Sequence, residues 1–267
     1  MSTTQSSAPT NRFSTRVADY LRYRPRYPEQ LYAILRDRLG LRRQSIVADI
    51  GSGTGIFCEP LLAEGITVYC VEPNREMREA GEELLRGYPG FHSVAGTAEA
   101  TGLPDASVDM ITAAQAFHWF DRPKARAEFA RILRPGGAVA LIWNDRSTSA
   151  SPFLLAYEDL LRRRAVDYEQ VVHRTISAGD ISTLEQFFAP NAVHRVVVAQ
   201  HEQRFDFDGL KGRVLSSSYV PLPGDERHEP LMEELRAIFD RHAENGTVAF
   251  VYDTVLYHGR LGGNDLQ

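Results

Sequence analysis

The spacing of apolar residues between positions 28 and 143 predicts strands and helices in alternation. Short apolar runs predict strands at residues 45–50, 67–71, 91–95, 108–114 and 138–143. Apolar positions that recur on one helical face predict helices at residues 28–39, 55–63, 75–85 and 124–133. Glycine and proline stand at several of the predicted ends, where they interrupt both kinds of element. This alternation favours parallel strand pairing, with helices on both faces of the sheet.

The pattern changes after residue 150. A long helix is predicted at residues 153–172, and two long β-rich stretches are predicted at residues 193–205 and 248–257. The segment between these stretches, residues 206–245, holds a predicted loop at 216–224 and a predicted helix at 230–241. Two terminal strands joined by a helical insertion indicate an antiparallel pair that completes the sheet. We therefore predict an α/β fold with a doubly wound, mainly parallel sheet of seven strands whose last strand is antiparallel.

Composition narrows the class of protein. The 267 residues suffice for one α/β domain with elaborations. Residues 1–11 are rich in Ser and Thr and have no apolar core, so we expect a disordered tail and not a signal peptide. No apolar run approaches the roughly 18 residues that span a bilayer. Cys58 and Cys70 have apolar neighbours, which predicts small core residues in a reducing compartment, the cytoplasm, and no metal site. A net charge of −5 argues against a nucleic-acid surface.

The most informative segment is residues 49–57, which read Asp-Ile-Gly-Ser-Gly-Thr-Gly-Ile-Phe after an apolar run. A strand that turns sharply into a helix leaves unsatisfied backbone N–H groups at the turn. Glycines allow a ligand to approach that backbone, because they carry no Cβ. The segment therefore predicts a loop that binds a nucleotide-containing cofactor.

The spacing of the glycines bears on which cofactor binds. The dinucleotide fingerprint is G-x-G-x-x-G, but here Ile56 stands at the third position and Gly55 comes one residue early. An acid, Glu72, ends the second predicted strand, where it can accept hydrogen bonds from both hydroxyls of an adenosine ribose. Asp49, directly before the glycines, suits a cationic ligand better than a pyrophosphate.

Five motifs, in order, resemble those of the class I S-adenosylmethionine-dependent methyltransferases over about residues 12–145. The motifs are residues 49–55, 71–77, 96–104, 113–120 and 133–137. The resemblance implies a single Rossmann-like methyltransferase domain over residues 12–267. Its cofactor-binding core would be residues 45–145, and residues 12–44 and 206–245 would cap the substrate.

The resemblance also implies S-adenosylmethionine as the cofactor and S-adenosylhomocysteine as its product. The residues expected to bind the cofactor are Asp49, Gly51, Ser52, Gly53, Gly55, Glu72, Pro73, Met77, Thr97, Ala98, Glu99 and Gln115. Among them, Glu72 is expected to bind ribose, Met77 to pack on adenine, and the segment near Ala98 to contact the adenine edge. Simpler explanations stand beside these. Asp49 could tie down the glycine turn, Glu72 could be a helix N-terminal acid, and Met77 could be a core residue.

The segment before the core carries a narrower likeness, to a small-molecule group that includes trans-aconitate methyltransferase. The likeness rests on Tyr20, on residues 23–28 and on residues 118–120, and it makes a carboxylic acid one candidate acceptor. Arg24 is a candidate to bind the cofactor carboxylate, because arginine binds carboxylates in a bidentate manner. Tyr23 is a cofactor-binding candidate beside it, and Tyr20 is a candidate lid residue that contacts substrate. The alternative is a surface segment that only docks on the fold.

Methyl transfer is an in-line displacement for which the cofactor supplies the electrophile. The protein must mainly bind, align and exclude water. His118 follows the fourth predicted strand, where an open α/β sheet has its ligand crevice, and is the candidate general base. It could instead bond to backbone or merely contact the cofactor. Trp119 is a candidate substrate wall or a packing residue, and Tyr219, in the 206–245 insertion, is a candidate substrate contact.

The function predicted from the sequence is transfer of a methyl group from S-adenosylmethionine to oxygen, nitrogen or carbon of a small organic molecule. A nicotinamide-dependent oxidoreductase is one alternative, which Ile56 and Asp49 disfavour. A cofactor-binding protein without methyl-transfer activity is the other, because a cofactor loop carries no information about turnover.

Overall fold

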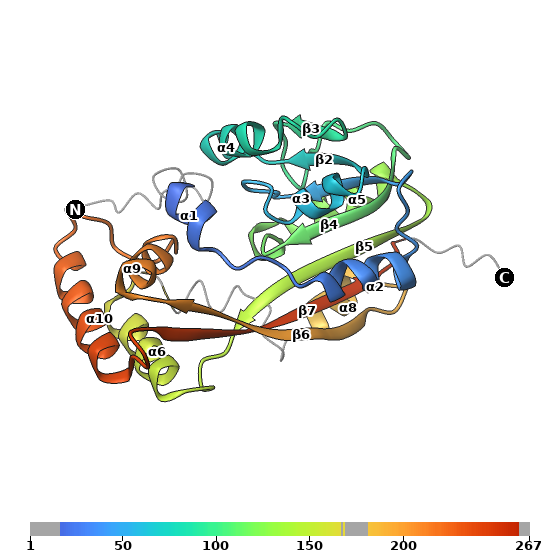
Figure 1. Cartoon of the computed structure of the whole chain (residues 1–267). Coiled ribbons are helices and arrows are strands. Elements are labelled where there is room, and N and C mark those ends of the chain that lie inside the picture. Colours follow the sequence, from blue (N-terminus) through green and yellow to red (C-terminus); the bar gives the residue numbers. More distant parts are fainter. Residues whose placement is uncertain (1–16, 167, 169–180, 262–267) are drawn as a thin grey trace, which may run out of the picture.

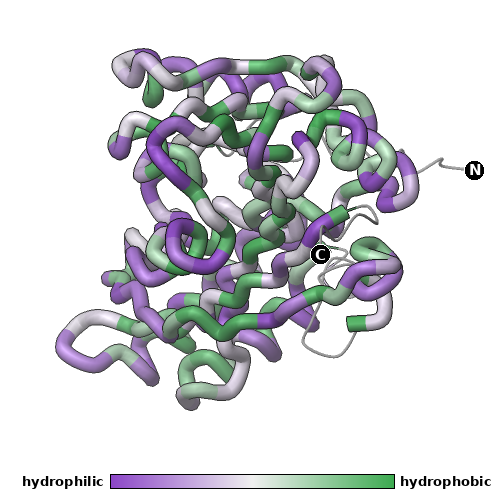
Figure 2. The backbone as a smooth tube through the Cα atoms, turned by 90° about the vertical axis from the view of Figure 1, so that its right-hand side faces the viewer, coloured by the Kyte–Doolittle hydropathy of each residue, from purple (hydrophilic) through white to green (hydrophobic). Residues whose placement is uncertain are grey.

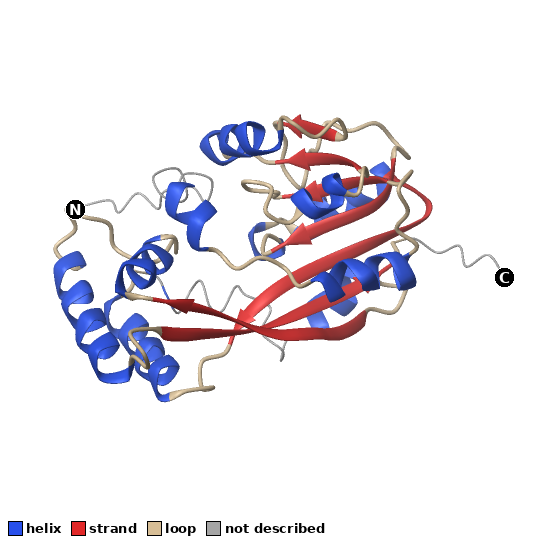
Figure 3. Ribbon diagram, in the orientation of Figure 1, coloured by secondary structure: helices blue, strands red, loops and turns tan. Residues whose placement is uncertain are grey.

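The computed structural model describes residues 17–166, 168 and 181–261. In these residues one seven-stranded sheet forms, with the strand order β3-β2-β1-β4-β5-β7-β6 (Figures 1 and 3). The strands are β1 (Ile46–Ile50), β2 (Thr67–Val71), β3 (Phe91–Val94), β4 (Val108–Ala114), β5 (Leu133–Arg146), β6 (His194–Phe205) and β7 (Val248–Gly259). The first five are parallel, and β7 pairs antiparallel with both β5 and β6. The predicted fold class is confirmed.

Helices lie on both faces of this sheet. The helices are α1 (Val17–Tyr23), α2 (Glu29–Leu39), α3 (Cys58–Ala63), α4 (Arg75–Leu85), α5 (Arg122–Ile132), α6 (Pro152–Arg164), α8 (Ile181–Phe188), α9 (Phe207–Leu215) and α10 (His228–His242), with a 3₁₀ turn, η3 (Phe117–Trp119). Apolar residues of α2, α3 and α4 pack on one face, and those of α5 and α8 pack on the other. Figure 2 shows hydrophobic segments running through the middle of the molecule.

Most predicted elements are confirmed, and the differences have local causes. The predicted helix at residues 55–63 begins only at Cys58, because residues 51–57 form the turns of the glycine loop. Strand β5 begins at Leu133, five residues before the prediction. Leu133 pairs with Val108 and Ala138 with Met110, so residues 134–137 bulge out as the expected tight turn.

Other sequence expectations differ more. Helix α6 ends at Arg164 and not at residue 172, because the backbone of Ala165 is extended. Helices α1, α8 and α9 were not predicted; α9 follows an aspartate N-cap, Asp206, whose side chain accepts a hydrogen bond from the Gly209 N–H. The tail predicted at residues 1–11 lies outside the described residues, as does most of residues 165–172.

Strands β5, β7 and β6 continue beyond the central sheet to a second group of helices (Figure 1). There α6, α9 and α10 pack with the ends of β6 and β7 around a third apolar cluster, which includes Phe205, Leu235 and Phe250. Helix α1 lies against α4 and α9, between the two parts of the molecule. A cavity lies here, lined by residues that follow the central strands and by residues of α6 and α9.

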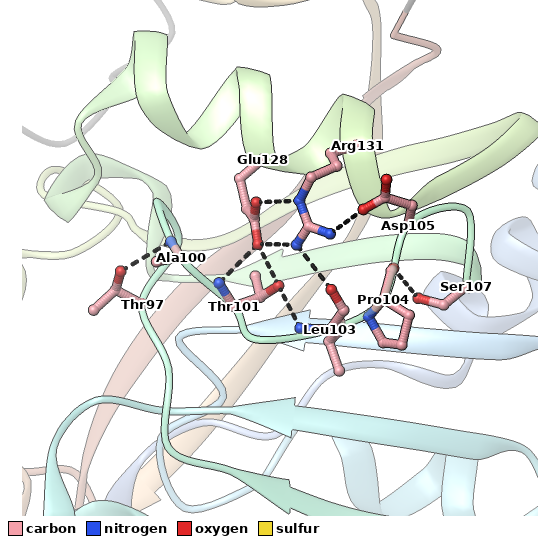
Figure 4. A network of polar contacts seen from close by, with 9 residues as sticks. All are labelled: Thr97, Ala100, Thr101, Leu103, Pro104, Asp105, Ser107, Glu128 and Arg131. Atoms are coloured by element: carbon pink, nitrogen blue, oxygen red, sulfur yellow. Dashed lines mark hydrogen bonds and ion pairs between the residues drawn. The ribbon is translucent and has the colours of Figure 1, made fainter.

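A polar network fastens the loop between β3 and β4 to helix α5 (Figure 4). Glu128 Oε1 accepts hydrogen bonds from the Thr101 N–H (2.8 Å), the Thr101 hydroxyl (2.6 Å) and the Arg131 guanidinium (2.7 Å). Arg131 also donates to the Leu103 carbonyl and pairs with Asp105. Hydrogen bonds from Arg131 and Thr101 lower the pKa of Glu128 to about 2. The network orders the loop in which the third cofactor motif lies.

We expect Glu128→Gln to lower the free energy of unfolding by about 1–2 kcal/mol at pH 7. The variant loses charge-assisted hydrogen bonds, and partial exposure of Arg131 reduces the loss. Because the folded pKa of Glu128 lies below its ordinary 4.5, its contribution is complete above about pH 5 and declines as pH falls toward 2. Urea unfolding at pH 7 and pH 3 measures both effects.

Glu79→Gln, in the exposed Arg75–Glu79 pair, is the control and should change stability by less than about 0.5 kcal/mol. Equal stability of wild type and Glu128→Gln at pH 7 would contradict the role of the network.

Candidate functional site

The carboxyl ends of β1 and β4 meet at the point where the strand order reverses. The chain leaves β1 for β2 on one side and returns to β4 on the other. Open α/β sheets bind ligands at such a switch point. The glycine loop follows β1 there, and residues 115–119 follow β4. The two segments touch, since a Cβ added to Gly51 would lie 2.6 Å from the Ala116 Cβ.

Three residues of the glycine loop adopt backbone conformations that favour glycine. Gly51, Gly53 and Gly55 have φ angles of +69°, +58° and +81°, in the left-handed region. Glu72, which is 8% exposed, accepts hydrogen bonds from the Gly53 N–H and the Asn74 N–H, each at 2.8 Å. Burial raises the pKa of Glu72. A carboxylate has about four lone-pair sites, so Glu72 can hold the loop through these two hydrogen bonds and still accept hydrogen bonds from ribose hydroxyls.

Asp49 lies in a different environment from the other residues of its motif. It is 1% exposed and accepts hydrogen bonds from the Thr112 hydroxyl (2.6 Å) and the Cys58 thiol (3.0 Å). Burial raises its pKa to about 6. The side chain thus joins β1 to β4 and α3, which is the position expected of a residue that ties down the glycine turn. Cys58 and Cys70 are buried free thiols, as expected of small core residues.

The residues expected around adenine and ribose gather near Gly53 and the loop after β3. Met77 is 4% exposed and lies beside Gly53, and Pro73 separates Glu72 from Asn74, the N-cap of α4. Ala98 is a core residue. The other two residues of the third motif make local contacts: Thr97 Oγ1 accepts from the Ala100 N–H, and Glu99 accepts from the Asp121 N–H before α5.

A cavity of about 530 Å³ opens next to the glycine loop. This volume lies within the roughly 300–1,000 Å³ of small-molecule sites. Eight sequence-predicted residues line it: Tyr20, Arg24, Gly51, Ser52, Gln115, His118, Trp119 and Tyr219. Asp49, Gly53, Gly55, Glu72, Pro73, Met77, Thr97, Ala98, Glu99 and Tyr23 are not among its lining residues.

Tyr23 packs between helices and not into the cavity. A Cβ added to Gly212 of α9 would lie 1.9 Å from the Tyr23 ring, and that ring also meets Phe205 edge-on. The close approach of α1 to α9 is therefore possible only because residue 212 is glycine. This contact places Tyr20 and Arg24, at the end of α1, against the cavity.

Gln115 is held in a conformation that non-glycine residues rarely adopt, with φ of +60°. Its backbone N–H donates to the Ile142 carbonyl and its side-chain amide donates to the Asn144 carbonyl (3.1 Å). Such outliers cluster at ligand sites, where the surrounding structure enforces them. The turn directs the chain into η3, where His118 and Trp119 pack together at 4.8 Å between ring centroids.

Sequence reasoning missed the far side of the cavity. That side is lined by Asn144, Asp145, Arg146, Glu158, Tyr168, Arg213 and Tyr252, from β5, β7, α6, α9 and the segment after α6. A signal was present for the first three, because the polar run 144–146 directly follows a buried strand at the carboxyl edge of the sheet. Nothing local in the sequence marks Arg213 as a cavity residue.

The arrangement fits S-adenosylmethionine. The buried Nε of Arg24 has no hydrogen-bond partner among the described residues, and Arg24 lines the cavity together with Gly51 and Ser52. A guanidinium at that position can hold the methionine carboxylate. Glu72 and Met77 both contact Gly53, and a carboxylate and an apolar side chain there could hold an adenosine.

Comparisons with known proteins agree with this geometry. Residues 48–141 match the methyltransferase domain family. The chain is similar to an uncharacterised methyltransferase of Mycobacterium tuberculosis, with 40% identity over 134 residues, which is 50% of this chain and 52% of the relative. It is also similar to an uncharacterised methyltransferase of Schizosaccharomyces pombe, with 34% identity over 57% of this chain and 59% of the relative. The chain thus spans only about half the length of the curated relatives that it matches.

A solved structure gives a likeness over nearly the whole chain. It is a candidate type II methyltransferase from Anaeromyxobacter dehalogenans, with a TM-score of 0.62, 25% identity, and coverage of 89% of this chain and 98% of that one. Residues 48–141 thus carry the methyltransferase domain match, and the fold is similar to that of a methyltransferase over most of the chain. Within residues 17–166, 168 and 181–261, no helix combines the length and apolarity needed to cross a membrane, and no cluster of potential metal ligands occurs.

We expect Glu72→Ala to weaken the binding of S-adenosylhomocysteine roughly 10- to 100-fold. The substitution leaves ribose hydroxyls and two backbone N–H groups without an acceptor, at a cost of about 1–3 kcal/mol. Isothermal titration calorimetry measures the affinity. Glu83→Gln, an exposed acid of the following helix, α4, is the control and should bind as the wild type does. Unchanged affinity in a folded Glu72→Ala protein would remove Glu72 from the ribose site.

Proposed function

We propose that this protein transfers a methyl group from S-adenosylmethionine to oxygen, nitrogen or carbon of a small organic molecule. The observation that carries the proposal is a cavity of about 530 Å³ that is lined both by the glycine loop and by polar residues from the end of β5 and the middle of β7. Its two ends differ in chemistry: glycine backbone and Ser52 at one end, and charged and aromatic side chains at the other. This division suits a cofactor and an acceptor bound side by side.

The chain's task in this reaction is to bind, orient and exclude water. When bound, S-adenosylmethionine supplies a methyl group on a sulfonium, which is already a good electrophile. Glu72 and Arg24 would hold its two ends, and Gln115 would contact the methionine part. Tyr20 would cover the site from α1, and Trp119 and Tyr219 would form walls around the acceptor.

His118 is the proposed general base. It lies at the carboxyl end of β4, in the cavity, beside the loop that would hold the methionine end of the cofactor. An imidazole there can take a proton from a hydroxyl or amine as the new bond to carbon forms. An acceptor that has no proton to lose would need His118 only for positioning.

The reaction is tested by incubating the purified protein with S-adenosylmethionine labelled in the methyl group and a metabolite extract. We expect label in a small molecule, because the cavity has room for an acceptor beside the cofactor. A protein that binds S-adenosylhomocysteine but labels nothing across varied extracts would be a cofactor-binding protein without transfer. A protein that binds reduced nicotinamide cofactor and not S-adenosylmethionine would contradict the proposal altogether.

His118→Ala should lower kcat with the labelled acceptor by roughly 100-fold or more and leave cofactor affinity within about threefold, because base catalysis acts in the transition state. Steady-state kinetics and calorimetry separate the two quantities. His92→Ala removes an exposed imidazole that stacks on Tyr69 and is not among the residues that line the cavity, so it is the matched control. Wild-type turnover at saturating acceptor would rule out the base role of His118.

A further inference from the structure

The side chain of Asn144, near the end of β5, connects segments from distant parts of the chain. Asn144 lines the cavity and is 7% exposed. Its Nδ2 donates a hydrogen bond to the Arg26 carbonyl (3.3 Å), in the segment that runs from α1 to α2 (Figure 1). Its Oδ1 accepts from the Thr254 hydroxyl of β7 (2.6 Å) and lies 3.3 Å from the Nε2 of His201 on β6. One amide thus joins the sheet to the segment before α2.

These partners determine which end of the amide faces the Arg26 carbonyl. A carbonyl oxygen can only accept a hydrogen bond, so the atom of Asn144 that faces it must be the Nδ2 donor. The Oδ1 atom then lies toward the Thr254 hydroxyl, which can donate, and toward His201, whose Nε2 donates when it carries the proton. An aspartate of the same size at position 144 would place an acceptor against the carbonyl.

The segment that Asn144 holds carries Arg24, the residue that would bind the cofactor carboxylate. Arg24 Nη2 donates to the Ser216 carbonyl at 2.8 Å, and its buried Nε has no hydrogen-bond partner among the described residues. Pro25, between Arg24 and Arg26, is buried and has a restricted φ angle, so the connecting backbone is stiff. Fixing the Arg26 carbonyl therefore limits where the Arg24 guanidinium can lie.

Other contacts hold this segment through exposed or more distant groups. The Arg26 side chain pairs with Glu59 of α3, but it is exposed, and exposed ion pairs contribute little. Tyr27 meets the Phe57 ring edge-on, with 5.4 Å between ring centroids. The hydrogen bond from Asn144 adds a contact between the main chain of the segment and a buried side chain of the sheet.

The main chain of Asn144 holds a second residue at the same end of the cavity. Its carbonyl accepts a hydrogen bond from the Gln115 side-chain amide at 3.1 Å. Gln115 is the residue whose backbone has the unusual φ of +60°. Arg24 and Gln115 both line the cavity and are both proposed to contact the methionine part of the cofactor. Asn144 therefore relates the positions of these two groups to each other.

We propose that Asn144 is a positioning residue for the cofactor, which holds the Arg26 carbonyl and thereby places the Arg24 guanidinium where it meets the methionine carboxylate. The inference rests on the proposed function, since it deepens the account of the same site. A positioning role of this kind predicts a loss of affinity that depends on the methionine part of the ligand. The adenosine part, near Glu72 and Met77, should not respond. A purely structural role would weaken the binding of both parts alike.

The first test compares S-adenosylhomocysteine with 5′-methylthioadenosine, a nucleoside thioether that has no amino-acid part. We expect Asn144→Asp to weaken the binding of S-adenosylhomocysteine roughly 5- to 30-fold, because an acceptor replaces the donor that faces the Arg26 carbonyl. The affinity for 5′-methylthioadenosine should change by less than about twofold, because that ligand makes no contact with Arg24. Calorimetry measures both. Full affinity for S-adenosylhomocysteine in the folded variant, or an equal loss for the two ligands, overturns the proposal.

Asn191→Asp is the matched control. Asn191 also donates from its Nδ2 to a backbone carbonyl, that of Arg260 (3.0 Å), but it is not among the residues that line the cavity. The same chemical change is thus made at a similar contact elsewhere in the fold. This variant should bind both ligands as the wild type does, and a loss equal to that of Asn144→Asp would contradict a specific role of Asn144.

A double-mutant cycle tests whether Asn144 acts through Arg24. Arg24→Met alone should weaken the binding of S-adenosylhomocysteine at least as much as Asn144→Asp does, because it removes the guanidinium itself. Adding Asn144→Asp to Arg24→Met should then cause no further loss beyond about twofold, since the group to be positioned is already absent. Additive losses would show that Asn144 acts elsewhere and would overturn the proposal. The cycle also decides the question if 5′-methylthioadenosine binds too weakly to be measured.

Thr254→Val is the milder variant to use if Asn144→Asp does not fold. It removes the hydroxyl that donates to the Asn144 Oδ1 and keeps a buried side chain of similar size. We expect a smaller loss of affinity with the same dependence on the ligand, because the amide loses one of the partners that orient it. In that case, unchanged affinity for S-adenosylhomocysteine in Thr254→Val overturns the proposal.

These binding experiments do not depend on turnover, so they separate the inference from the proposed function. A selective loss of S-adenosylhomocysteine affinity, together with no labelled product from the wild type, would support the role of Asn144 and contradict methyl transfer. Labelled product from the wild type without a selective loss in the variant would support methyl transfer and overturn the role of Asn144.

Discussion

The parallel pairing of β1 with β4 is the constraint on which the rest of the molecule depends. Strands β2 and β3 lie on one side of β1, whereas β4 and β5 lie on its other side. The segments that follow β1 and β4 therefore leave the sheet at the same edge and diverge there, which creates a crevice. Asp49 strengthens this junction from within, since it accepts a hydrogen bond from Thr112 of β4 and another from Cys58 of α3. The glycine loop and residues 115–119 meet there, and Gly51, Ser52, Gln115 and His118 line one cavity.

The length of β5, β7 and β6 gives the second half of the site. These strands run on past the central helices and support α6, α9 and α10 around their own apolar cluster (Figure 1). Residues at the end of β5 and in the middle of β7 therefore line a cavity. The close contact of Tyr23 with Gly212 joins α1 to this part of the molecule and holds Arg24 near Arg213.

The polar interactions at the two ends of the cavity have different characters. Near the glycine loop, Glu72 is satisfied by backbone N–H groups, so this end is ordered within the protein itself. On the side of α9, Arg213 has only neutral hydrogen-bond partners among the described residues. Uncompensated buried charge lowers stability, and its retention is typical of ligand sites, where binding restores the balance. The two ends thus agree with a division between an invariable cofactor and a selective acceptor pocket.

The sequence alone determined the order and type of the central elements and the cofactor loop, because these depend on local signals. Apolar periodicity, an early third glycine and an acid at the end of β2 are all visible within residues 45–72. It also placed Tyr20, Arg24, His118, Trp119 and Tyr219 as site candidates, and the structure brings these five to one cavity. Only the tertiary structure decided that Asp49 faces Thr112 and Cys58, and that Tyr23 packs on α9. It alone brought Arg24, Arg146 and Arg213 together, since they lie up to 189 positions apart and meet only through long-range packing of α1, β5 and α9.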